Sequence, residues 1–318
     1  MKARAKILSL FLAASLLCST GATAHAAASA PLKEGRETGK IGKISLKDYL
    51  QSQRKLEAVT RIAEIQEKYL RQGCSISQQE RQELEQILAE YYPEASISAY
   101  LPAPETRRAS LQEGARPNAA VIPSVVDAFP RVYLNLPGQL QETKYYCGPA
   151  SAYAVLNGLG IAVTQSDLAK TMKTTTDGTG FYNVAPALNS YSGRNGKTFK
   201  YETMAGYKLT GKSMTAAQWE KNFVNAAVAT LSANRGVIYN CHQVKGSQTY
   251  LQGYAGLDGK ARSTIWHFVA GEGWDKRNSQ TLYCLYYDSN NINLENYHHM
   301  RIPFSKMAIL CNDRGLIY

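Results

Sequence analysis

The sequence predicts an α+β protein whose helices come first and whose antiparallel strands come last. Apolar residues recur at spacings of three and four in several segments between residues 45 and 236, a pattern typical of amphipathic helices. From Gly236 onward, short runs rich in β-branched and aromatic residues alternate with turn residues, which indicates strands. This separation favours a segregated α+β domain over a doubly wound parallel sheet.

Residues 1–26 have the layout of a secretory signal peptide. Three basic residues, Lys2, Arg4 and Lys6, precede an apolar core at 7–17, and small residues follow where cleavage is expected. The core has about eleven residues, whereas a helix that crosses a bilayer needs roughly twenty. We therefore expect an exported protein that is secreted, or otherwise extracytoplasmic and associated with the cell surface.

Residues 27–101 are predicted to form a helical N-terminal region. The apolar stripe over 45–70 predicts one long helix. A second helix is expected to begin at Ser77, because Glu80 follows at the spacing of a capping box, and to stop before Pro93. The two helices are expected to pair as an antiparallel hairpin.

A linker at 102–127 follows the hairpin. It contains four prolines and two adjacent arginines, Arg107 and Arg108, and shows little periodicity. The region before it is predicted to be either a propeptide, removed by a cut near these arginines, or a permanent accessory domain.

Residues 128–318 are predicted to form the second domain, with its helices before most of its strands. Helices are expected at 148–157, from Ser166, at 181–191 and at 214–236. Strands are expected at 131–136, 236–242, 249–256, 264–274 and 280–289.

Cys147 is the strongest candidate for chemistry in this domain. It stands in the stretch "YYCGPAS", where Pro149 suits the first turn of a helix. A helix N-terminus stabilises a thiolate through its partial positive charge and its unpaired amides. Gly148 is expected to leave room for a substrate backbone. We therefore interpret Cys147 as a nucleophile.

A cysteine nucleophile needs a base and a group that orients the base. His267 lies in the predicted strand 264–274, and Asp288 ends the next predicted strand. If the two strands are antiparallel neighbours, the carboxylate reaches the imidazole and holds its tautomer. The remaining histidines are less suitable for this role: His25, His242, His298 and His299.

Acyl transfer also needs hydrogen-bond donors for the developing oxyanion. The backbone N–H of Cys147 is one expected donor. The side chain of Gln141, six residues upstream, is the second, with Gln139 as a weaker competitor on spacing alone.

These residues resemble the C39-like family of papain-like cysteine peptidases. The resemblance rests on Gln141 before "CGPAS", on "HFVAGEGWD" and on "YYDSNN", and it covers about residues 130–291. It implies a papain-like fold and hydrolysis of peptide bonds through a thioester acyl-enzyme. It also implies that Cys147 is the nucleophile, His267 the base, Asp288 the orienting acid and Gln141 the oxyanion donor.

One departure from the family pattern concerns the late aspartate. Family members usually have proline after it, whereas Ser289 and Asn290 follow Asp288 here. Asp275 is therefore an alternative third residue. The chain looks like the free-standing secreted kind of this family, whose substrates are peptides or proteins.

The distribution of charge along the chain indicates what kind of partner the protein binds. Residues 27–127 carry 14 basic and 14 acidic side chains, whereas 128–318 carry 19 basic and 11 acidic ones. No arginine-rich run or nucleic-acid-binding motif accompanies this surplus, so we expect anionic cell-wall polymers or lipid headgroups rather than nucleic acid. No spacing of the zinc type or glycine-rich phosphate loop is present, and no cofactor or metal is expected.

Four other cysteines follow the signal peptide: Cys74, Cys241, Cys284 and Cys311. In an oxidising compartment they can form two disulfides in any of three pairings. Cys241 and Cys284 are better candidates for a disulfide than Cys147, because both lie in predicted strands that could be neighbours.

Two other functions are consistent with the sequence. A papain-like fold also suits an amidase or transpeptidase that acts on cell-wall peptides. The 21 tyrosines against 7 phenylalanines also suit a non-catalytic module that binds peptides.

Overall fold

The computed structural model describes residues 41, 44–70, 75–101, 126, 129–211, 213–277, 280–290 and 298–318. These residues belong to one compact unit, Glu37–Tyr318. The predicted signal peptide at 1–26, Cys74 and nearly all of the linker at 102–127 lie outside the described residues.

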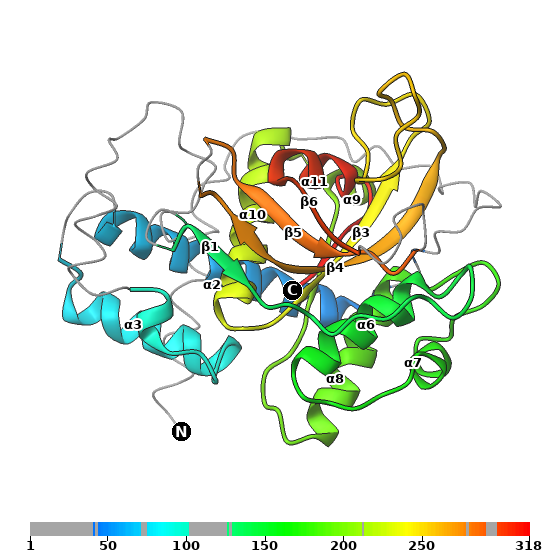
Figure 1. Ribbon diagram of the computed structural model, residues 1–318. Coiled ribbons are helices and arrows are strands. Elements are labelled where there is room, and N and C mark those ends of the chain that lie inside the picture. The colour runs from blue at the N-terminus through cyan, green and yellow to red at the C-terminus, as the bar shows by residue number, and fades with distance from the viewer. Residues whose placement is uncertain are drawn as a thin grey trace, which may run out of the picture. The chain divides into compact units, whose positions relative to one another are not determined.

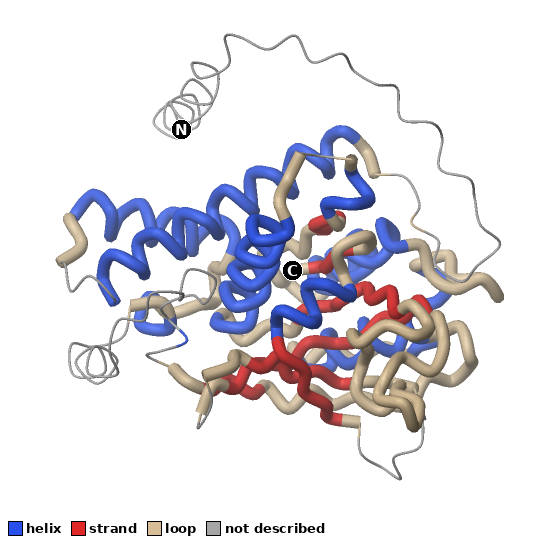
Figure 2. The backbone as a smooth tube through the Cα atoms, turned by 90° about the horizontal axis from the view of Figure 1, so that it is seen from above, coloured by secondary structure: helices blue, strands red, loops and turns tan. Residues whose placement is uncertain are grey.

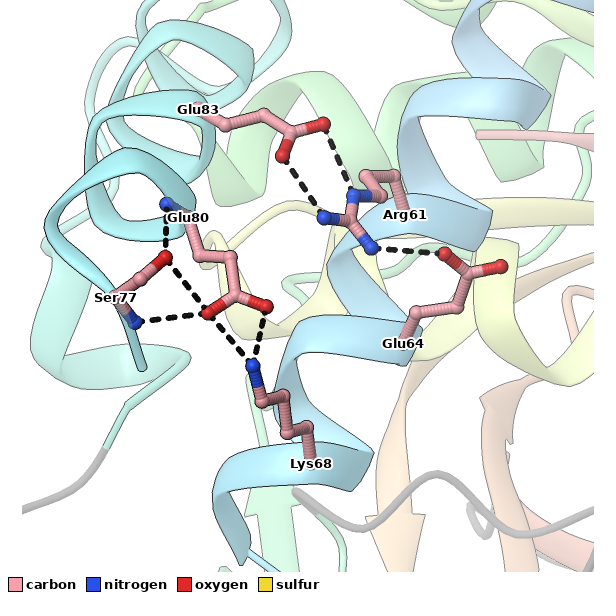
Figure 3. Close-up of polar contacts among 6 residues, drawn as sticks. All are labelled: Arg61, Glu64, Lys68, Ser77, Glu80 and Glu83. Atoms are coloured by element: carbon pink, nitrogen blue, oxygen red, sulfur yellow. Dashed lines mark hydrogen bonds and ion pairs between the residues drawn. The ribbon is translucent and has the colours of Figure 1, made fainter. Parts of the chain in front are cut away.

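The N-terminal helices are those that the sequence predicts. Helix α2 spans Leu46–Leu70 and helix α3 spans Gln78–Tyr91. The capping box between Ser77 and Glu80 is present. Arg61 pairs with Glu83 and Lys68 pairs with Glu80, so the two helices run antiparallel; the close-up shows these ion pairs bridging them (Figure 3).

An antiparallel sheet forms the centre of the rest of the unit (Figure 1). In the described part of the chain it has seven strands, of which six lie side by side: β2 (Thr203–Ala205), β7 (Gly315–Ile317), β3 (Val237–Gln243), β4 (Ile265–Asp275), β5 (Tyr283–Tyr287) and β6 (His299–Pro303). Strand β1 (Arg131–Tyr133) pairs with the end of β4. The predicted α+β class, with helices packed on an antiparallel sheet, is confirmed.

Helices cover both faces of this sheet. On one face lie α6 (Cys147–Gly158), α7 (Gln165–Thr171) and α8 (Val184–Arg194), together with the short η2 (Phe181–Asn183). On the other face lie α10 (Ala216–Ser232) and α11 (Phe304–Leu310). Residues of β3 alternate between the two cores, Ile238 on the α6 side and Tyr239 on the α10 side, as a strand buried on both faces requires.

The N-terminal helices share the α10 core. Val59 and Ile62 of α2 are each 1% exposed and belong to the same apolar cluster as Phe223 of α10. Tyr100, just after η1 (Ile97–Ala99), donates a hydrogen bond of 2.8 Å to the carbonyl of Ala229. Figure 2 shows these helices lying along one side of the strands.

A bulge in β4 lets β1 join the sheet. The register between β4 and β5 shifts between Gly271 and Gly273. Gly273 has a φ of 156°, and a Cβ there would lie 1.9 Å from the carbonyl oxygen of Val132. Only glycine therefore allows this close approach of β1.

Two expectations about strands are wrong. The segment 249–256 is a loop between β3 and β4, because its backbone bonds to a side chain instead of a strand: the N–H of Leu251 donates to Oε1 of Gln243. The last predicted strand is 280–289, whereas β6 starts at His299 and β7 at Gly315. The short helix α9 (Tyr207–Thr210) was also not predicted.

Candidate active site

Cys147 is the first residue of α6, one residue earlier than predicted. Pro149 follows in the first turn, where its missing N–H costs no helical hydrogen bond. The space beside Gly148 does not face a substrate, because a Cβ there would lie 2.7 Å from Oγ1 of Thr179. Glycine is needed at this position for packing against Thr179.

His267 and Asp288 come from adjacent strands. β4 and β5 are antiparallel neighbours, and Asp288 directly follows β5. Nε2 of His267 lies 2.7 Å from Oδ1 of Asp288, and the two side chains are 6% and 1% exposed. The N–H of Asn290 donates a further bond of 2.9 Å to the same oxygen. The carboxylate is therefore fixed by its own chain as well as by the imidazole.

The thiol of Cys147 meets the other nitrogen of this imidazole, since Nε2 is occupied by Asp288. Burial acts to raise the pKa of the thiol, but the hydrogen bond and charge of His267, with the N–H groups of Phe268 and Gly148, outweigh it and lower the pKa. For His267, burial acts against the charged form, yet Asp288 raises the pKa well above its usual value. Both shifts favour a thiolate–imidazolium pair.

Gln141 lies beside this pair and lines the same cleft. Its Nε2 donates to the carbonyl of Thr143 at 2.9 Å, which uses one of two amide hydrogens and leaves the second for a ligand. Its backbone N–H bonds to the carbonyl of Ser289 at 2.9 Å, so the loop before α6 is tied to the segment that carries Asp288. Gln139 is exposed and does not line the cleft.

The cleft has a volume of about 210 Å³ and exposes Cys147 and His267. One wall is the loop before α6, and the turn at Gly178 and Thr179 faces it. Strands β3 and β4 supply the remaining wall, which includes Asn240 and Trp266. A peptide entering here meets the thiol at the helix N-terminus.

Asp275, the alternative third residue, does not contact His267. It ends β4, where its carboxylate accepts a bond of 2.9 Å from Arg277 and lies 3.7 Å from Arg131. The hydrogen bonds from Arg277 lower its pKa although partial burial acts to raise it. The structure thus brings Cys147, His267, Asp288 and Gln141 together and leaves Asp275 apart.

The structure contains two further histidine–carboxylate pairs that the sequence does not predict. Nδ1 of His242 lies 2.5 Å from Oδ2 of Asp313, 71 residues away in the chain. Nδ1 of His299 lies 2.9 Å from both oxygens of Glu272, which is fully buried. Each pair joins residues of different strands or of a strand and a distant loop, so no local sequence spacing predicts either pair.

The described cysteines are all free thiols. Cys241 and Cys284, the better candidates for a disulfide, are therefore not bonded to each other. Sγ of Cys241 lies 3.8 Å from Sγ of Cys311 in the α10 core. Cys284 contacts the carbonyl of Leu285 at 3.8 Å.

Comparison with known proteins identifies the family. A model of the Peptidase_C39 like family matches residues 133–308. The chain belongs to this family. Membership of the C39-like family supports a cysteine peptidase, and the match covers the cleft with Cys147 and His267.

Two solved structures are also similar to the chain. One is the Amb a 11 cysteine protease, a major ragweed pollen allergen, in its proform, with 10% identity, a TM-score of 0.38, and coverage of 87% of this chain and 97% of that chain. The other is digestive procathepsin L 3 of Tenebrio molitor larval midgut, with 12% identity, a TM-score of 0.33, and coverage of 87% and 93%. A search of curated proteins gave no match.

None of the helices in the described residues is long and apolar enough to cross a membrane. No group of three or more His, Cys, Asp or Glu side chains among these residues is arranged to hold a metal ion.

Proposed function

We propose that this protein is a secreted cysteine peptidase that hydrolyses peptide bonds of proteins or peptides through Cys147, His267, Asp288 and Gln141. One observation carries the proposal: a thiol at a helix N-terminus, hydrogen-bonded to an imidazole that a buried carboxylate orients, opens into a cleft. That arrangement supplies a nucleophile, a base and an orienting group in contact.

In the first half of the reaction, the Cys147 thiolate attacks the carbonyl carbon of the scissile bond. The oxyanion that forms accepts hydrogen bonds from the N–H of Cys147 and from the second amide hydrogen of Gln141. The imidazolium of His267 then gives its proton to the leaving amine as the C–N bond breaks. The product is a thioester between Cys147 and the acyl half of the substrate.

In the second half, water enters and gives a proton to His267 as it attacks the thioester carbonyl. The second tetrahedral intermediate collapses, the C–S bond breaks, and the carboxylic acid product leaves. Cys147 leaves as a thiolate while the proton taken from water stays on His267, so the thiolate–imidazolium pair is restored. Asp288 stays ionised throughout and holds the imidazole by the bond to Nε2.

Cys147→Ala is the direct test of this function. The purified wild-type protein is expected to cleave unstructured polypeptides, and Cys147→Ala is expected to lose that cleavage entirely. Iodoacetamide is expected to alkylate native Cys147 at neutral pH faster than a denatured thiol, because the native pKa is lowered. Equal cleavage by the two proteins would remove the catalytic assignment, and equal alkylation rates would favour a peptide-binding module.

Cell-wall peptides serve as a second substrate class in the same assay. If muropeptides are cut and polypeptides are not, the site acts as an amidase or transpeptidase of the cell wall. The basic surplus of residues 128–318 supports contact with an anionic wall or membrane surface, and the layout of residues 1–26 supports export.

For the N-terminal region, we favour a permanent accessory domain over a propeptide. The basis is its burial: Val59, Ile62 and Tyr100 lie in the α10 core and are at most 1% exposed. Removal of α2 and α3 would expose this apolar surface to water.

A further inference from the structure

The wall of the cleft contains a buried amide without a partner. Asn240 lies on β3, is 4% exposed and lines the cleft. Its side chain makes no hydrogen bond to any residue that the structure describes. Its polar atoms reach the cleft rather than the sealed core, and a side-chain amide shielded from bulk water nearly always has a partner, so this one is suited to a partner that arrives with the substrate.

Strand register places Asn240 next to the reacting atoms. It stands opposite Phe268 on β4, and the N–H of Phe268 is one of the groups that stabilise the Cys147 thiolate. Directly opposed residues of an antiparallel pair share a face. Two residues deeper on that face, Ile238 and Ala270 are buried in the α6 core. Asn240 is thus the polar residue where this face emerges from the core into the cleft.

The next residue pair on the same face of β3 and β4, toward the outside of the cleft, consists of two stacked rings. His242 stands opposite Trp266, and the two rings stack with centroids 4.9 Å apart and planes inclined by 13°. Asp313 holds His242 from behind, and Arg314 lies over the indole at 5.5 Å. Asn240 therefore stands directly opposite Phe268 and diagonally from Trp266, and both aromatic residues line the cleft beside it.

The charges around this position indicate what it binds. Among the lining residues, Lys144 is the one charged side chain besides the catalytic pair, and it is exposed at the surface. The Asp313 carboxylate is already hydrogen-bonded to Nδ1 of His242. An ionised substrate group beside Asn240 would lose its water without gaining a counter-ion.

We propose that Asn240 is a specificity-determining residue that accepts a neutral hydrogen-bonding side chain of the substrate, asparagine or glutamine best and serine or threonine next. A carboxamide is the best match because it offers one donor and one acceptor, the complement of the Asn240 amide. This inference rests on the proposed peptidase function.

The test compares the cleavage sites of four proteins on a peptide library made from a digested proteome, read by mass spectrometry: wild type, Asn240→Leu, Asn225→Leu and Cys147→Ala. Leucine has nearly the shape of asparagine and lacks its hydrogen bonds. Asn225 is the matched control, because it is also buried with an unpaired Nδ2 but lies on α10, outside the cleft.

At one fixed position near the scissile bond, wild type and Asn225→Leu are expected to favour amide side chains, and Asn240→Leu is expected to favour leucine or methionine. For two synthetic peptides that differ only by asparagine or leucine at that position, the ratio of kcat/KM is expected to change by about 10- to 100-fold on substitution of Asn240. The inverted preference requires an active Asn240→Leu protein, so misfolding cannot imitate it.

Other outcomes overturn the inference. A wild-type profile with no preference at any position would mean that water alone satisfies Asn240. A preference that survives Asn240→Leu would place the selectivity elsewhere. Cleavage that persists in Cys147→Ala would overturn the peptidase function itself, which separates the two failures.

Discussion

At the scale of single residues, the opposed pKa shifts of Cys147 and His267 define when the site is active. The pKa of the thiol is lowered and that of the imidazole is raised, so the thiolate–imidazolium pair exists between the two values. Activity is expected to rise as pH increases through the Cys147 pKa and to fall as pH increases through the His267 pKa.

Asp288→Ala tests whether the Asp288 carboxylate extends the active pH range to higher pH. Loss of the carboxylate removes the interaction that raises the pKa of His267, so the alkaline limb of the pH profile should move to lower pH. The kcat/KM should fall by about 10²- to 10³-fold. Asp288→Asn keeps an acceptor for Nε2 and should retain more activity with the same shift. Asp275→Asn is the matched control, and a similar shift there would contradict the assignment.

The buried Glu272 makes stability depend on His299. The hydrogen bonds with Glu272 raise the pKa of His299 although partial burial acts to lower it. A raised histidine pKa stabilises the fold below the unfolded value, and this contribution is lost as pH rises through the folded pKa. His299→Gln should lower the free energy of unfolding by about 1–3 kcal/mol at pH 6, measured by urea denaturation.

The pH dependence provides the check on this prediction. The gap between wild type and His299→Gln should shrink at alkaline pH, where His299 is neutral in both states. His298→Gln is the control, since His298 has no described carboxylate partner. A gap that is constant with pH would mean that packing against Tyr133 and Tyr287, rather than charge, explains the loss.

At the scale of elements, a buried lysine joins α2 to the sheet. Nζ of Lys55 donates to the carbonyl oxygens of Tyr318 at 2.6 Å and Lys200 at 3.0 Å, and it lies 4.6 Å from the centre of the Tyr318 ring. Burial lowers its pKa well below the usual value. The partly exposed ion pairs between α2 and α3 (Figure 3) contribute little by comparison.

Lys55→Met keeps the length of the side chain and removes its donors. The carbonyl of Lys200 would then lose this donor, and that of Tyr318 would keep only the N–H of Glu202. The free energy of unfolding should therefore fall by about 1–3 kcal/mol. Lys47→Met on the exposed face of the same helix should leave the urea midpoint unchanged. Equal effects of the two substitutions would mean that α2 is not anchored through Lys55.

At the scale of the whole molecule, the N-terminal helices and the sheet share one apolar core. Arg235, 1% exposed, adds to this link: its guanidinium donates to the carbonyl of Tyr91 at 3.0 Å and lies 3.9 Å from the centre of the Phe199 ring. Helix α3 is thereby bonded to the segment that leads into β3. Such burial favours a single cooperative unit.

Cleavage of the linker tests whether the N-terminal helices and the sheet form one cooperative unit. A recognition site for a specific protease, inserted within 102–127, should allow cleavage without separation: the two fragments should elute together in native gel filtration and retain peptidase activity. The uncut protein is the control. Dissociation of residues 27–101 together with a rise in activity would show instead that the region is a propeptide.

The helices and the catalytic motif follow from local sequence, because their causes are local. Apolar spacing and capping boxes define α2, α3 and α10, and the helix opening at Cys147 is written in "CGPAS". The family match confirms the resemblance that these motifs suggested. His267 and Asp288 were also predictable, because consecutive antiparallel strands bring them together.

Only the tertiary structure decided the contacts between distant segments. The pairing of Glu272 with His299, the burial of Lys55 and the position of Asn240 in the cleft depend on strand register and on helices that pack from the far end of the chain. A sequence records which side chains can bond. It does not record which of them are buried together. That shared burial brings Asp288 and Asn240 to the cleft that begins at Cys147.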